Sequence, residues 1–353
     1  VHFIGKDNIV FHCIIFPAIL KAHGDYILPQ NVPANQFMNL EGRKISTSRN
    51  WAVWVHEYVE AHPDKIDELK YYLIKNMPEQ KDSEFTWKGF QDACNNELVN
   101  NLANFANRVM VLCNKYFDGV LPEVDENKQI IGAEGETEFY ESEMIALHDQ
   151  MQEVNAYLWK YNFRGALQAW MQIATRGNQL LQNNEPWKLV KTDPEKTKVV
   201  MNLSAQYLAG IVQLMRVFMP GKSEQLLDML QWRDSGSLLS NLNHLSEGHS
   251  FLQPGHQLGA AQHLFSRIED QWIKKELDKL NASDQNEDGS DVDFKPMAEE
   301  IGFEDFMKMD IRTATILQAE KMPKANKLLK LEVDLGFEKR TIVSGIAKHY
   351  KPE

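Results

Sequence analysis

Two polar segments near the start of the chain carry residue types that suit phosphate binding. Gly5, Lys6 and Asp7 follow an apolar run where a buried strand is expected to become a helix, the position at which α/β sheets bind nucleotides. Residues 44–48 read Lys-Ile-Ser-Thr-Ser within a polar stretch. A flexible cation beside hydroxyl and backbone donors can stabilise the charge that builds on a departing phosphate group in the transition state. Taken singly, the first segment also fits an ordinary strand-to-helix turn capped by Asp7, and the second fits a solvated surface loop.

His12 and Phe16 stand four residues apart in an apolar segment, residues 8–20, that predicts a buried helix. Positions i and i+4 share one helix face, so the imidazole and the phenyl ring are expected to lie side by side. The spacing alone leaves open whether they line a ligand pocket or whether His12 is a core histidine packed among apolar neighbours.

Asn104, Arg108 and Trp187 have side chains that suit single-stranded RNA. Asn104 and Arg108 stand one turn apart on a predicted helix, and Pro186-Trp187 follows the end of a later helix. Unstacked bases are recognised by hydrogen bonds to their edges and by stacking, which an amide, a guanidinium and an indole can supply. The alternative is a solvated Asn/Arg face and a tryptophan that anchors a loop.

The elements that position these residues change along the chain. Short strands are predicted at residues 1–5, 26–28 and 36–40, which indicates an α/β segment. From Trp51 the apolar period changes to 3.6 and strand signals disappear for more than 200 residues. Helical stripes cover residues 66–74, 90–117, 144–159, 166–181, 199–218, 226–230 and 261–280. Boundaries at Asp118-Gly119, Asp193-Pro194 and Pro220-Gly221 leave short loops, which predicts an up-and-down bundle.

The end of the chain differs in composition from the middle. Residues 276–300 hold nine acidic residues against two lysines and predict a linker. Three β-rich runs follow, at residues 312–319, 328–333 and 341–346, and three strands are too few to close a small barrel. Because the chain also begins at Val1 rather than at a methionine, we expect a piece of a longer protein. Lysines at 324, 327 and 330 suit a nucleic-acid backbone, or else a solvated charged hairpin.

Composition limits the class of protein. The 353 residues predict two or three domains, and 43% hydrophobic with 25% charged residues excludes bulk disorder and membrane insertion. The three cysteines form no CxxC pair, which argues against a disulfide framework and a zinc knuckle and favours a reducing cytoplasm. A net charge of -12 permits a local basic groove but does not predict one.

Taken in order, Gly5-Lys6-Asp7, Phe11-His12, Pro17-Ala18, residues 44–48, the helical middle and the β tail resemble methionyl-tRNA synthetases. These are class I aminoacyl-tRNA synthetases, and the likeness is to the bacterial type with an appended C-terminal tRNA-binding domain. Residues 44–48 resemble the family's Lys-Met-Ser-Lys-Ser loop but carry Thr47 where most members have a second lysine.

The resemblance implies a role for each candidate residue. Gly5, Lys6, Asp7 and Lys44 would bind ATP, with Lys44, Ser46 and Ser48 acting in catalysis, and His12 and Phe16 would line the methionine pocket. Asn104, Arg108, Pro186 and Trp187 would bind the anticodon, and Lys324, Lys327 and Lys330 would contact tRNA. No metal ligand is expected in this chain, because the family's zinc insertion and its His-Ile-Gly-His signature belong upstream of Val1.

The resemblance also implies the architecture and the activity. The fold would be mainly α, with residues 1–60 ending a Rossmann-like catalytic domain, 61–280 forming the anticodon-binding bundle, 281–300 a flexible acidic linker and 301–353 the start of an OB-fold barrel. The complete protein would use ATP and Mg²⁺ to activate methionine to methionyl-adenylate and transfer it to tRNA(Met), in the cytoplasm and as a homodimer through its C-terminal domain. This piece alone would be inactive. The alternatives are a non-catalytic tRNA-binding or assembly protein and another class I synthetase for an aliphatic amino acid.

Overall fold

The computed structural model describes residues 1–124, 136–233, 242, 249–285, 303–310, 312–323 and 325–352. The chain is mainly helical and divides into two compact units, Val1–Ser290 and Asp291–Glu353. Most of the linker expected at 281–300 lies outside the described residues. No helix in the described ranges is long and apolar enough to cross a membrane.

The first unit begins with two small sheets. Strand β1 (Ile4–Gly5) pairs in parallel with β2 (Ala34–Asn35), and the chain between them forms short 3-10 and π turns and helix α1 (Phe16–His23). The second sheet has the order β4-β3-β5, with β3 (Met38–Leu40) antiparallel to β4 (Arg43–Lys44) and parallel to β5 (Ser83–Phe85). Glu41 and Gly42 form the turn between β3 and β4, and both have positive φ, 48° and 76°, as a two-residue type I′ hairpin requires.

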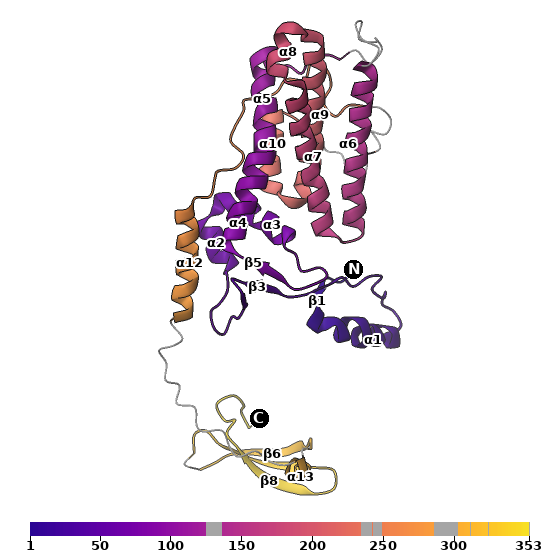
Figure 1. The fold of residues 1–353 in the computed structure, drawn as a ribbon. Coiled ribbons are helices and arrows are strands. Elements are labelled where there is room, and N and C mark those ends of the chain that lie inside the picture. Colours follow the sequence, from indigo (N-terminus) through magenta and orange to yellow (C-terminus); the bar gives the residue numbers. More distant parts are fainter. Residues whose placement is uncertain are drawn as a thin grey trace. The chain divides into compact units, whose positions relative to one another are not determined.

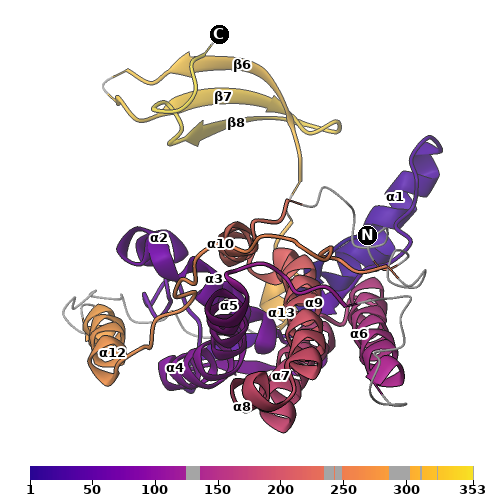
Figure 2. The same cartoon turned by 90° about the horizontal axis from the view of Figure 1, so that it is seen from above.

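A helical bundle forms most of the first unit, as predicted. Its helices are α2 (Val55–Ala61), α3 (Ile66–Lys75), α4 (Trp87–Ala93), α5 (Asn104–Phe117), α6 (Glu136–Trp159), α7 (Phe163–Asn184), α8 (Pro186–Thr192), α9 (Pro194–Phe218), α10 (Pro220–Leu230) and α12 (Asp270–Gln285). A π-helical stretch, Cys94–Ala103, joins α4 to α5. Helices α5, α6, α7, α9 and α10 run side by side, and Figure 2 shows them nearly end-on (Figures 1 and 2).

The predicted helix boundaries are confirmed by local chemistry. Asp193 Oδ1 accepts a hydrogen bond from the Lys196 backbone N at 3.1 Å, and Pro194 occupies the first position of α9. Asp118 and Gly119 both have positive φ at the end of α5, which releases the chain from the helix.

Helices α5 and α7 approach closely at a glycine. A Cβ placed on Gly177 of α7 would lie 2.4 Å from Cζ of Phe105, which is fully buried in α5. Only a residue without a side chain fits at this position, so Gly177 sets the spacing between the two helices.

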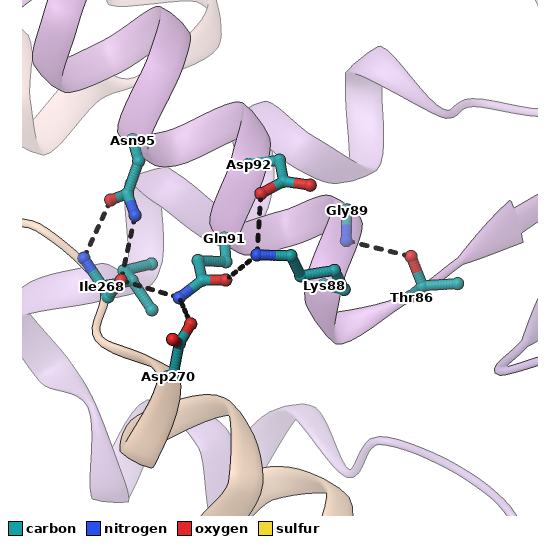
Figure 3. Close-up of polar contacts among 8 residues, drawn as sticks. All are labelled: Thr86, Lys88, Gly89, Gln91, Asp92, Asn95, Ile268 and Asp270. Atoms are coloured by element: carbon teal, nitrogen blue, oxygen red, sulfur yellow. Dashed lines mark hydrogen bonds and ion pairs between the residues drawn. The ribbon is translucent and has the colours of Figure 1, made fainter.

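An extended segment, residues 258–269 (the strap), leads from the bundle to α12. Asn95 of the π stretch bonds both polar atoms of the Ile268 backbone, accepting from its N and donating to its O at 2.9 Å (Figure 3). Gln91 Nε2 donates to the same carbonyl at 3.0 Å and to Asp270 Oδ1 at 2.8 Å. Helix α12 then packs the Trp272 ring 5.6 Å from that of Trp87. Two amide side chains therefore fix the path of the strap.

Asn95→Ala should lower the free energy of unfolding by about 1–3 kcal/mol, because both backbone groups of Ile268 lose a partner. Urea unfolding followed by circular dichroism measures the loss. Asn96→Ala, at the exposed neighbouring position, is the matched control and should change stability little. Equal stability of the two variants would show that the strap does not depend on Asn95.

Four sequence-based expectations were wrong. Residues 26–28 form no strand. Strand β5 interrupts the supposedly all-helical middle, because pairing with β3 decides the conformation of a three-residue segment that periodicity cannot resolve. The helix expected over 261–280 begins only at Asp270, because the segment before it buries Leu264, Phe265 and Ile268 without forming a helix. In addition, the apolar residues of segment 8–20 form a helix as expected, but most are exposed in this chain.

The second unit contains the expected antiparallel sheet. Strand β7 (Leu329–Asp334) lies between β6 (Thr315–Lys321) and β8 (Lys339–Ser344). A short helix, α13 (Phe303–Phe306), precedes the sheet in sequence. Leu329, Leu331 and Val333 are buried on one face of β7, and the residues between them are exposed on the other.

Candidate functional site

The two expected phosphate-binding segments meet at the ring of Phe37. Lys6 Nζ lies 4.3 Å and Lys44 Nζ 5.6 Å from the centroid of this ring. The sheet explains the meeting, because the parallel strands β1 and β2 end at one edge and are followed there by Lys6 and Phe37. The structure thus brings two cations from distant segments onto one aromatic ring.

Asp82, from a third segment of the chain, contacts both Lys6 and Phe37. Its Oδ1 accepts hydrogen bonds from Lys6 Nζ at 2.8 Å and from the Phe37 backbone N at 3.0 Å. The bond from Lys6 is the main reason that the pKa of this carboxyl lies below its ordinary value. Sequence reasoning missed Phe37 and Asp82, since neither belongs to a motif and only the pairing of β3 with β5 brings Asp82 to this place.

Gly5 is the last residue of β1, and Asp7 lies in the 3-10 helix that follows it directly, Lys6–Asn8. A Cβ on Gly5 would lie 2.6 Å from Asp7 Oδ1, so the carboxyl folds back over a position that only glycine leaves open. Asp7 itself is exposed. The turn thus presents an acidic side chain next to Lys6.

The segment 44–48 is held in place at Ser46, which pairs with Trp51. Ser46 and Trp51 exchange backbone hydrogen bonds of 3.0 and 2.9 Å, and Ser46 Oγ lies 3.1 Å from Ser48 Oγ. Trp51 Nε1 donates to the Leu40 carbonyl at 2.9 Å, which ties the loop to β3. Lys44, Thr47 and Ser48 are exposed, so the loop presents its polar groups to solvent from an anchored base.

His12 and Phe16 lie side by side as predicted, with their ring centroids 6.3 Å apart. His2 completes a trio, 5.5 Å from His12 and 5.9 Å from Phe16. The Nδ1 atoms of both histidines are buried and have no hydrogen-bond partner in the part of the chain that the structure describes. His2 was not predicted, because nothing in its spacing relates it to His12.

Asn104 and Arg108 of α5 lie near Trp187 of α8. The Arg108 guanidinium carbon lies 5.0 Å from the centre of the Trp187 ring. Asn104 Nδ2 and Arg108 Nη1 both donate to Oδ1 of Asn178 on α7, at 3.4 Å each. Partial burial lowers the pKa of Arg108 from its ordinary value. Asn178 escaped sequence reasoning, since it lies inside a helical stripe without a motif.

Pro186 and Trp187 differ in accessibility. Pro186 is buried at the first position of α8, directly after Glu185, which has a φ of 42°. Trp187 is partly exposed. The proline thus starts the short helix that carries the indole toward Arg108.

Of the three lysines predicted to contact tRNA, Lys327 and Lys330 lie within the described residues of the second unit. Lys330 is exposed on the outer face of β7, opposite Glu320 of β6. Lys327 is exposed in the turn before β7, and Lys324 lies outside the described residues. Across the described parts of both units, no group of three or more His, Cys, Asp or Glu residues is placed to hold a metal ion.

Three family models match consecutive parts of the chain. Residues 1–110 match class I tRNA synthetases (M), residues 131–284 the anticodon binding domain of methionyl tRNA ligase, and residues 311–353 a putative tRNA binding domain. Together they account for both compact units.

Curated relatives match the chain over its whole length. Methionine–tRNA ligases of Christiangramia forsetii and Bacteroides fragilis are each 48% identical to it, and that of Flavobacterium johnsoniae is 47% identical. All of this chain is covered in each comparison, against 50%, 50% and 52% of the three relatives. The chain therefore spans about half the length of the relatives it matches.

Solved structures support the fold. Mycobacterium tuberculosis methionyl-tRNA synthetase in complex with methionyl-adenylate matches with a TM-score of 0.64 and 23% identity, over 75% of this chain and 50% of that one. The free state of the same enzyme gives a TM-score of 0.63 at 22% identity, over 76% of this chain and 49% of that one. With the three consecutive family models and the relatives nearly half identical over its full length, the chain belongs to the methionyl-tRNA synthetase family of class I aminoacyl-tRNA synthetases.

Proposed function

We propose that the whole protein containing this chain is a methionine–tRNA ligase. In the first step a methionine carboxylate oxygen attacks the α-phosphorus of ATP, the bond to the β-phosphate oxygen breaks, and pyrophosphate leaves. In the second step a hydroxyl of the terminal tRNA ribose attacks the methionyl carbonyl, and AMP leaves. The observation that carries the proposal is the meeting of Lys6 and Lys44 at Phe37 in a chain of this family.

Lys44 would stabilise the departing pyrophosphate. Its ammonium stands at the start of an exposed loop, where it can follow the phosphates as charge builds on them. Ser46 and Ser48 would add hydroxyl donors from the same loop. ATP would enter with Mg²⁺ as the substrate complex, and Gly5, Lys6 and Asp7 would bind its nucleotide part from the turn after β1. Thr47 has no charge, so Lys6 is the second cation at this site.

His12 and Phe16 would line the methionine pocket together with His2. Their rings form an apolar surface for a thioether, and the unpartnered Nδ1 atoms offer polar contacts beside it. His2 precedes β1 and the Gly5-Lys6-Asp7 segment ends it, so the amino acid would bind close to the nucleotide.

The bundle would read the anticodon. Trp187 would stack on the first anticodon base, and Asn104 and Arg108 would bond base edges. Pro186 would position Trp187. We also assign residues 1–60 to the catalytic part, 61–280 to the bundle, 281–300 to the linker and 301–353 to the C-terminal tRNA-binding domain. In that domain Lys324, Lys327 and Lys330 would contact tRNA. The whole protein would dimerise through the same domain and would act in the cytoplasm.

Binding of the 353-residue chain to methionine tRNA, and to the same tRNA with its first anticodon base changed, tests the reading of the anticodon at fixed salt. A loss of ~1 kcal/mol or more on changing the base supports it. Equal binding would leave a protein that recognises only the shape of tRNA. Pyrophosphate exchange by the whole protein separates a ligase from a non-catalytic relative.

Trp187→Ala should weaken binding of methionine tRNA by ~1 to 3 kcal/mol, because stacking on one base is lost. Filter binding with the 353-residue chain measures the change. Pyrophosphate exchange by the whole protein should stay intact, since the indole lies in the bundle rather than at the phosphate site. Unchanged affinity for tRNA would refute the assigned contact.

A further inference from the structure

We propose that Asn178 is a positioning residue that holds Asn104 and Arg108 ready for the anticodon base, an inference that rests on the proposed function of the bundle. Asn178 lies on α7, across the helix interface from the two residues that it contacts on α5. Its carboxamide oxygen accepts a hydrogen bond from each of these two side chains.

The orientation of the Asn178 amide is fixed by its surroundings. Nδ2 lies 2.9 Å from the Asn101 carbonyl, 2.9 Å from Asn101 Oδ1 and 3.2 Å from the Ala174 carbonyl. All three partners are acceptors, so the nitrogen must face them and the oxygen must face α5. An amide turned the other way would point its oxygen at three acceptors and its nitrogen at two donors.

A second layer holds Asn101. Its Nδ2 donates to Thr175 Oγ1 at 3.0 Å, and that hydroxyl donates back to the Met171 carbonyl of α7 at 3.2 Å. The network therefore starts and ends on α7. These hydrogen bonds set the orientation of the Asn178 carboxamide and do not involve the remaining N–H groups of Asn104 and Arg108.

The hydrogen bonds from Asn104 and Arg108 to Asn178 Oδ1 are long. At 3.4 Å each, they exceed the usual N–H···O distance of about 2.9–3.0 Å. One oxygen that serves two donors at this distance orients them without saturating them, and a guanidinium has five donors of which this contact uses one. Asn104 and Arg108 thus keep free hydrogen-bonding capacity for a base edge.

Asn178 does not suit direct base contact, because its donors face protein acceptors and its oxygen faces α5. Its effect on RNA must pass through Asn104 and Arg108. Loss of Asn178 should therefore reduce discrimination at the anticodon more than it reduces general attraction to the tRNA backbone.

The experiment compares Asn178→Ala and Asn178→Asp with Gln179→Ala in the 353-residue chain, using methionine tRNA and the same tRNA with its first anticodon base changed. Gln179 is the exposed neighbour on α7 and serves as the matched control. Asn178→Ala should lower the ratio of the two affinities by roughly 3- to 10-fold, as loss of hydrogen bonds does. Asn178→Asp should lower it further, because one carboxylate oxygen would face the three acceptors that Nδ2 now contacts and the other would pair with Arg108 and withdraw it from the base.

Two further readouts separate positioning from a structural role. The slope of log affinity against log salt should stay unchanged in Asn178→Ala, since no phosphate contact is removed, and thermal unfolding shows whether the bundle remains folded. If the folded Asn178→Ala chain keeps the wild-type ratio while Trp187→Ala lowers it, the inference about Asn178 is overturned and the anticodon site stands. If the wild-type chain shows no discrimination, the proposed function of the bundle fails first.

Discussion

Lys44→Ala, made in the whole protein that carries this chain, should slow methionyl-adenylate formation by roughly 10²- to 10³-fold, or about 2.7–4 kcal/mol of transition-state stabilisation. Lys44 is the exposed last residue of β4, and its ammonium would meet the phosphates mainly as pyrophosphate departs, so its removal should act on kcat. Pyrophosphate exchange at saturating ATP and methionine measures this rate.

Methionine binding provides the internal control, because His12 and Phe16 come from a different element. Lys44→Arg keeps the charge but replaces a compact ammonium with a planar guanidinium, and it should recover part of the rate. Losses of equal size in adenylate formation and in methionine binding would contradict the assigned role and would indicate a general disturbance of the catalytic part.

Gly177→Ala should lower the free energy of unfolding of the bundle by about 2 kcal/mol. Overpacking a core costs up to about 3 kcal/mol, and the better helix propensity of alanine returns at most about 1. The new Cβ meets three atoms of the Phe105 ring at 2.4 to 2.7 Å, and this ring is fully buried and cannot turn away. Urea unfolding followed by circular dichroism measures the loss.

A double-mutant cycle tests the cause. Phe105→Leu removes the three ring atoms that an added Cβ would meet, so Gly177→Ala should cost much less in that background. Because Asn178 follows Gly177 directly, the single variant should also weaken anticodon discrimination. Additive effects of the two substitutions would show that the clash does not govern the spacing of α5 and α7.

The sequence alone predicted the elements whose signals are local. The bundle, its boundaries at Asp118 and Asp193, and the antiparallel sheet of the second unit follow from apolar period, capping residues and β-rich runs. Strand β5 was missed because three residues carry no period, and the strap was taken for a helix because buried apolar residues at helical spacing need not be helical.

The same limit applies to the candidate sites. Lys44, His12, Arg108 and Trp187 could be selected by residue type and resemblance, and the structure adds where they lie. Phe37, Asp82 and Asn178 could not be selected, since each acts through a residue that is distant in sequence and near only after folding. Positioning residues of this kind have no motif of their own.

Helix α12 determines how a mechanical pull on the C-terminal unit would enter the rest of the molecule. The covalent path from that unit reaches the first unit at α12, whose Trp272 ring lies among aromatic rings and whose Glu276 Oε1 is 3.0 Å from His62 Nε2. Tension would therefore act on these contacts, and then on the hydrogen bonds from Asn95 to Ile268, before it reached helices α5, α6, α7, α9 and α10. A load applied to the C-terminal unit would therefore displace α12 from its contacts first and would reach the contacts between α5, α7 and α8 last.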